Sequence, residues 1–341
     1  MRRLFLILLW LNFQVSAEVV ESNQSAALVD SINTSNVDKT VRAIEAVISK
    51  KSGLSLAEVK QRYSHDPTND SLVVRQYRKD IPVNMKQNQQ WFHAIVDGQK
   101  MTEMMLTQGF PIWPERREPM FVMVVAETEQ QPLSYVDAGT DIRYWLEQWF
   151  EVMGLPAVFY NALEDDLLSF MPSDVRYLNP DLIDHIRLEH EIDHVLLVFV
   201  SQTSRGYGFR IGLSKPEQPL VIKNLQFVNL GLGMQSLATT VQGELSAGQQ
   251  ISADEFVPGT VALRVTDVMD ANQMLSLTNY LSDQPLVEAF QINAYRSKRL
   301  DVMLRIRVKP ETFVTSVEQS GLLQYVPVNE LGQVMVFKML P

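Results

Sequence analysis

HEIDHVLLVF, residues 190–199, begins with the His-Glu-x-x-His pattern of zinc peptidases and ends in a run of β-branched and aromatic residues. In a zinc peptidase both histidines lie on one helix, the glutamate between them is the base, and a third ligand follows. Here residues 195–200 are all apolar, which is typical of a strand inside a sheet. We therefore predict that a helix ends near Asp193 and leads into a buried strand, so that the imidazoles of His190 and His194 diverge.

A zinc hydrolase that uses His190, Glu191 and His194 is the alternative hypothesis. No histidine follows His194, so the third ligand of such a site would be a carboxylate such as Glu217. The histidines of the chain are His65, His93, His185, His190 and His194. A different site at the end of the same helix would combine His185, Glu189 and His190. Because a motif needs its structural context, we predict no catalytic, cofactor-binding or metal-ligating residue and no cofactor.

Three further patterns have an ordinary structural interpretation. Glycines 206, 208 and 212 lie within or beside a predicted strand, whereas a dinucleotide-binding pattern precedes a helix. Met101, Met104 and Met105 have the spacing of an apolar helix face, so we expect them in a core, with copper binding as the alternative. The neighbouring acids Asp165 and Asp166 are interpreted as solvated. Phosphate-binding loops and nucleophile elbows are absent from the sequence.

The composition is that of a folded protein of more than one domain. The chain has 341 residues, of which 46% are hydrophobic and 21% charged. It has no cysteine, which excludes disulfide bonds, thiol catalysis and cysteine-ligated zinc.

The first 17 residues, MRRLFLILLWLNFQVSA, have the pattern of a secretory signal peptide: two arginines, an apolar run and small residues at the end. We expect cleavage after Ala17; the alternative, a permanent anchor, would need about 20 apolar residues. No later stretch is long and apolar enough to span a membrane. The prediction is therefore a soluble protein exported to the periplasm.

The charge of the mature chain argues against polyanionic partners. Removal of Arg2 and Arg3 leaves 28 basic against 40 acidic residues, a net charge of −12. Nucleic acid and anionic lipid surfaces are therefore not expected to bind. The local basic cluster of Arg75, Arg78 and Lys79 is interpreted as a solvated face.

Three small domains are predicted, of α/β and α+β class. The first, residues 18–115, is an α+β unit: helical spacing followed by Gly53 predicts a helix over 36–52, and Asp97 caps a later helix that stops at Gly109.

In the second domain, residues 116–250, strands alternate with helices, which predicts a parallel or mixed α/β layer. Its predicted strands are 120–126, 156–161, 195–200, 207–214 and 221–230, and its helices are 142–155, 179–191 and 233–247. The third domain, residues 257–341, has the order β-α-β-β-α-β of a ferredoxin-like unit. Its predicted elements are a strand at 261–268, a helix at 271–283, two strands within 287–308, a helix at 310–321 and a strand at 333–340.

The order of these pieces resembles the proteobacterial domain-of-unknown-function family 2066 over nearly the whole mature chain. The residues that carry the resemblance are Phe110-Pro111-x-Trp113, the strand MFVMVVA and the junction EIDHVLLVFV. The middle domain is more distantly similar to periplasmic adaptor domains such as the TolB N-terminal domain and the lipoprotein activators of penicillin-binding proteins. In those domains a Gly-Ala-Asp type turn precedes the junction strand, where this chain has Glu191-Ile192-Asp193. The resemblance implies an envelope protein, but it supplies no catalytic residues.

The leading hypothesis is a non-enzymatic periplasmic binding or adaptor protein whose partners are other envelope proteins. Exposed sheet edges would accept a partner strand. The zinc hydrolase is the first alternative, and a module that binds peptidoglycan fragments or small molecules is the second.

Overall fold

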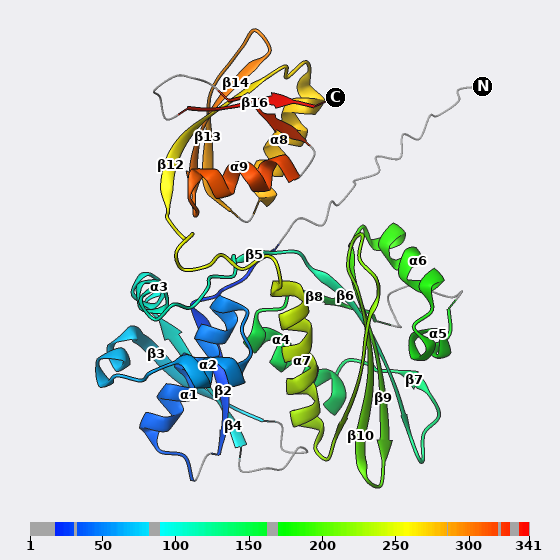
Figure 1. Cartoon of the computed structure of the whole chain (residues 1–341). Helices are drawn as coiled ribbons and strands as arrows, with labels where there is room; N and C mark the ends of the chain where they lie inside the picture. The colour runs from blue at the N-terminus through cyan, green and yellow to red at the C-terminus, as the bar shows by residue number, and fades with distance from the viewer. Residues whose placement is uncertain are drawn as a thin grey trace, which may run out of the picture.

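The computed structural model describes residues 18–30, 33–81, 89–161, 170–284, 286–319, 322–327 and 334–340. They form a mixed α/β structure in which three sheets, each with its own helices, follow one another along the chain (Figure 1). A short two-stranded pair, β1 (Glu18–Val19) with β5 (Arg116–Arg117), joins the start of the described chain to the start of the middle sheet. The predicted mixed fold class is confirmed.

The first sheet is antiparallel and has the order β2-β4-β3. Its elements are β2 (Gln24–Asp30), α1 (Asn36–Ser52), α2 (Leu56–Arg62), the 3-10 helix η1 (Pro67–Leu72), β3 (Val73–Asp80), β4 (Gln89–Val96) and α3 (Gly98–Thr107). As predicted, α1 ends at Gly53, whose φ of 72° is the left-handed conformation common after helices. The side chain of Asp97 caps α3 by accepting from the N–H of Lys100. Met101 and Met105 are fully buried in the core of this unit and Met104 packs against it, which confirms the core interpretation.

The middle sheet has six strands in the order β11-β10-β9-β6-β7, with β8 also paired to β6. Its strands are β6 (Met120–Thr128), β7 (Ser134–Tyr135), β8 (Ala157–Phe159), β9 (His194–Thr203), β10 (Gly206–Ser214) and β11 (Val221–Phe227). Its helices are α4 (Asp141–Met153), α5 (Pro172–Tyr177), α6 (Pro180–His190) and α7 (Leu230–Ser246). β6 is parallel to β8 and β9, whereas β10 and β11 are antiparallel additions, so the layer is mixed.

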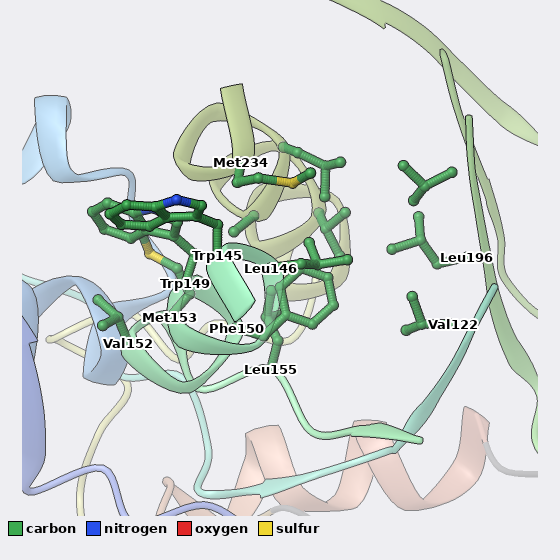
Figure 2. Packing of buried hydrophobic residues seen from close by; sticks show 14 of the residues in the cluster. Val122, Trp145, Leu146, Trp149, Phe150, Val152, Met153, Leu155, Leu196 and Met234 are labelled. Atoms are coloured by element: carbon green, nitrogen blue, oxygen red, sulfur yellow. The ribbon is translucent and has the colours of Figure 1, made fainter. Parts of the chain in front are cut away.

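Helices cover both faces of this sheet. In Figure 1 the sheet is seen nearly edge on, with α4 and α7 on one side and α5 and α6 on the other. Figure 2 shows the α4 side, where Leu146 and Phe150 of α4 and Met234 of α7 face the strand residues Val122 and Leu196. The same core includes Ala26, Ala46 and Trp91, so it extends across the predicted boundary into the first unit.

The C-terminal sheet has five strands in the order β13-β14-β12-β16-β15. Its elements are β12 (Gly259–Thr266), α8 (Ala271–Asp283), β13 (Val287–Arg296), β14 (Arg299–Ile306), α9 (Pro310–Gln319), β15 (Leu323–Tyr325) and β16 (Val334–Met339). The predicted β-α-β-β-α-β order is present, with β15 as one strand more. β16 pairs with β12 in parallel and with β15 in a hairpin, whereas β12, β14 and β13 alternate in direction.

The carboxyl ends of α1 and α4 meet at Arg117, which is 2% exposed. Its guanidinium donates to the carbonyl oxygens of Gly154 (2.6 Å), Lys50 (2.7 Å) and Pro114 (3.0 Å), and stacks 3.6 Å over the ring of Trp113. Carbonyl groups at a helix end lack partners within the helix and attract cations, so a buried arginine fits between two such ends. Burial lowers the pKa of Arg117 to about 9, which leaves it protonated at neutral pH.

Two polar residues of α7 donate hydrogen bonds to carbonyl groups at the carboxyl ends of α1 and α4. Gln242, which is fully buried, donates from Nε2 to the carbonyl oxygens of Ser49 (3.0 Å) and Met153 (3.3 Å). The hydroxyl of Ser246 donates to the carbonyl of Gly53 at 3.0 Å. We call Arg117, Gln242 and Ser246 the helix-end cluster. It positions the first unit against the middle sheet through directional hydrogen bonds as well as through the shared core.

Candidate functional site

The HEIDH stretch is a junction between a helix and a strand. α6 ends at His190, Glu191 follows with φ 53° in the left-handed region, and β9 begins at His194. Arg187 of α6 holds the turn by donating from Nε to the carbonyl of Asp193 at 3.0 Å. The predicted change from coiled to extended backbone is confirmed.

The two histidines of the motif point to opposite faces of the middle sheet. The His190 ring stacks on Phe121, with 4.2 Å between ring centroids, and Phe121 belongs to the core beneath α5 and α6. Val195, the first residue after His194, also points into that core. Because side chains alternate along a strand, His194 points to the other face, where its Nδ1 lies 3.0 Å from Oε2 of Glu118. The geometry of a zinc peptidase, with both imidazoles on one helix, is therefore not present.

The other candidate ligands do not assemble a metal site either. Among the residues that the structure describes, no group of three or more histidine or acidic side chains could hold a metal ion. Glu217 lies in the turn between β10 and β11, and the His185 ring packs 5.2 Å from that of Phe170. Asp165 and Asp166 lie outside the described residues.

A groove over β9, β10 and β11 can hold a ligand. It consists of two adjoining hollows of about 410 Å³ and about 450 Å³, which share Ser201, Gly208 and Gln226 in their linings. This is the size range of ligand sites. α5 bounds one end through Arg176 and Tyr177. The groove therefore lies beside α5, where the outer strands of the sheet have no covering helix.

Three arginines give the groove a positive lining. Arg176, Arg205 and Arg210 line it, and none of the lining residues is an aspartate or a glutamate. Arg176 lies 4.8 Å over the Phe199 ring and donates to Glu127 at 2.7 Å, so it is already held in place. The Nε of Arg210 is buried and has no hydrogen-bond partner within the described part of the chain. We call this feature the arginine groove. Its charge is opposite to that of the chain as a whole, which carries a net −10.

The groove is open because β10 presents glycine where its neighbours present short polar side chains. Gly208 pairs with Ser201 of β9 and with Gln226 of β11, so the three lie in one row across the sheet. A Cβ at Gly208 would lie 2.7 Å from Oγ of Ser201. A larger side chain there would fill the place where the two hollows meet.

Sequence reasoning missed the arginine groove. Glycines 206, 208 and 212 were weighed only as a nucleotide-binding pattern, and the structure confirms that they lie within β10. The available signal was their even spacing, which places them on one face of a strand. Recognising a groove also required the order β9-β10-β11 and the position of α5, which no local pattern contains.

The predicted basic cluster lies elsewhere, on β3. Arg75, Arg78 and Lys79 are exposed there, and Lys79 donates to Oε1 of Gln148 at 3.3 Å. None of these three residues lines the arginine groove.

Comparison with known proteins adds no relative. No family model matches the chain, and neither a curated protein nor a solved structure matches it. In the described residues, the helices are too short or too polar for any of them to cross a membrane.

Proposed function

We propose that this chain is a non-enzymatic binding or adaptor protein of the cell envelope, and that it holds a carboxylate-bearing partner in the arginine groove. The observation that carries the proposal is the groove itself, in which three arginines and no acidic residue line the hollows of a net acidic chain. Arginine recognises carboxylates through paired N–H donors, and such bonds are stronger than those between neutral groups.

Two further considerations support this proposal over a hydrolase. His190 and His194 diverge across the sheet, so the only peptidase-like pattern does not form its site. The lining of the groove offers positive charge, amides and hydroxyls, which bind a ligand without activating a nucleophile. The periplasmic location rests on the signal-peptide pattern of residues 1–17, which lie outside the described structure.

The test is comparative capture from envelope extracts with three forms of the mature protein. One is the native sequence, one carries Arg205→Gln and Arg210→Gln, and the control carries Arg296→Gln and Arg305→Gln. Arg296 and Arg305 are exposed on the C-terminal sheet, so both double variants lose the same charge. We expect a partner that the native and control proteins recover and the groove variant does not. Equal recovery by all three forms, or turnover on a hydrolase substrate panel, would contradict the proposal.

A further inference from the structure

The arginine groove ends at an exposed sheet edge. β11 is the last strand of the middle sheet, and along it Ile222, Lys223, Asn224 and Gln226 are exposed. The backbone N–H and C=O groups of an edge strand that face away from the sheet can pair with another chain. Such an edge beside a groove is the arrangement in which an extended peptide adds as a further strand and its side chains enter pockets.

β11 differs from the other sheet edges of the described chain in being long, regular and exposed. Its seven residues pair with β10 without a register shift, and it contains no proline. The edge strands β3 and β13 both contain register shifts, and β7, β8 and β15 have only two or three residues. β2 is regular, but it is largely buried. Natural sheets protect their edges with bulges, short strands and charged side chains; β11 has neither bulge nor short length, and its one lysine, Lys223, lies 3.7 Å from Glu244.

The side chains of β11 leave room for charges to meet above it. Asn224 pairs with Arg210 and Gln226 pairs with Gly208. On the groove face, therefore, only the side chain of Asn224 lies between Arg210 and the free edge of β11. A strand added beside β11 would lie roughly 10 Å from β10, two strand spacings away. An arginine and a glutamate side chain together reach across that distance.

We propose that the occupant of the arginine groove is an extended, acidic segment of a partner polypeptide that pairs with the edge of β11 and places every second side chain, a carboxylate, over the groove. This inference rests on the proposed function and specifies its ligand. A polypeptide is favoured over a glycan because only a polypeptide backbone presents alternating N–H donors and C=O acceptors at the spacing of a free edge strand. Lys223 of β11 points to the other face of the sheet, where its Nζ lies 3.7 Å from Oε1 of Glu244, so the positive charge available to the added strand comes from the arginines.

The test uses the mature protein and the fluorescent peptide TEVEVEVET, in which glutamates alternate with valines. Binding is measured by fluorescence anisotropy. The control peptide is TQVQVQVQT, in which glutamines of similar size replace the charged glutamates. Two further versions carry backbone N-methyl groups, either on the glutamates or on the valines. Alternate residues of a strand direct their N–H groups to opposite sides, so only one of these versions can still pair with β11.

We expect the acidic peptide to bind at least about tenfold more tightly than the glutamine peptide. One N-methylated version should lose this affinity and the other should keep it. The Arg205→Gln, Arg210→Gln protein should bind the acidic peptide about tenfold more weakly, whereas the Arg296→Gln, Arg305→Gln control should bind it unchanged. Circular dichroism of each variant checks that the fold is retained.

The outcomes separate this inference from the proposed function. If the acidic peptide binds through the arginines but both N-methylated versions bind alike, pairing with the edge of β11 is contradicted. The proposal that the arginine groove binds carboxylates is then still supported. If the peptides fail while anionic peptidoglycan fragments bind with the same dependence on Arg205 and Arg210, the occupant is a glycan and the inference is overturned. If neither class binds, the groove proposal fails as well.

Discussion

Gly154 lies directly against Arg117, whose Nη1 donates to the Gly154 carbonyl at 2.6 Å. The glycine ends α4 with φ 66°, and a Cβ added to it would overlap the same nitrogen. At Gly154 the chain therefore adopts the left-handed conformation, and the Arg117 guanidinium occupies the space that a side chain at position 154 would need. A glycine and a buried arginine thus depend on each other at the joint between two sheets.

This relationship predicts that Gly154→Ala is far more destabilising than Gly109→Ala. Gly109 has φ 74°, but a Cβ added there meets nothing within 4 Å. Its substitution should cost only the left-handed strain of about 1–2 kcal/mol. Gly154→Ala should cost at least about 3 kcal/mol, because it also displaces buried hydrogen bonds. Urea unfolding of both variants measures the difference, and equal losses would show that Arg117 is not fixed there.

Local patterns in the sequence predicted the elements well. The helix from Asp270 through 271–283 and the junction at His194 lie where capping and β-branched residues placed them. Among the elements missed are β2, which has few β-branched residues, and the short β7, α5 and β15, which have two, six and three residues.

Relationships between distant segments could not be predicted in the same way. Arg117 contacts carbonyls that are 37 and 67 residues away, and Gln242 contacts one 193 residues away. Neither residue belongs to a pattern that indicates a partner. The arginine groove likewise combines α5 with three strands, whose order follows from tertiary packing.

Lys50 provides a test of pH dependence. It is 5% exposed, its ammonium donates to the carbonyl of Gln24 at 3.0 Å, and burial lowers its pKa to about 8. An unfolded lysine has a pKa of about 10.4. Between these two pKa values the folded chain releases a proton that the unfolded chain retains, so the free energy of unfolding rises with pH. Below about pH 8 Lys50 is charged in both states, and the cost of burying its charge is at its maximum.

The variant Lys50→Met should remove this rise. For the native protein, the contribution of Lys50 to the free energy of unfolding should increase by up to about 3 kcal/mol between about pH 7 and about pH 10.5. The control Lys60→Met changes an exposed lysine and should leave the rise in place. Unfolding by urea across this range measures both, and an identical pH profile for native protein and Lys50→Met would refute a buried ammonium.

Metal content tests the geometry of the HEIDH junction. Since His190 and His194 lie on opposite faces of the sheet, purified native protein should retain no stoichiometric zinc after dialysis. The His190→Ala, His194→Ala double variant should have the same content by elemental analysis. A zinc peptidase site would instead retain about one zinc per chain and lose it in the double variant. That result would favour the zinc hydrolase hypothesis over the binding protein.

Gln242 tests whether the helix-end cluster needs its directional bonds. Gln242→Leu keeps the volume but removes the side-chain donor to both carbonyls, leaving that of Met153 without this bond and that of Ser49 with only the N–H of Gly53, which should lower the free energy of unfolding by about 1–3 kcal/mol. Gln242→Glu should be worse at neutral pH, because a buried carboxylate would face two carbonyl oxygens. Burial would raise the pKa of that carboxyl, so Gln242→Glu should recover part of its stability as the pH falls and the group becomes neutral. The exposed Gln218→Leu serves as the control. If Gln242→Leu were as stable as this control, the hydrophobic core alone would hold α7 against the ends of α1 and α4.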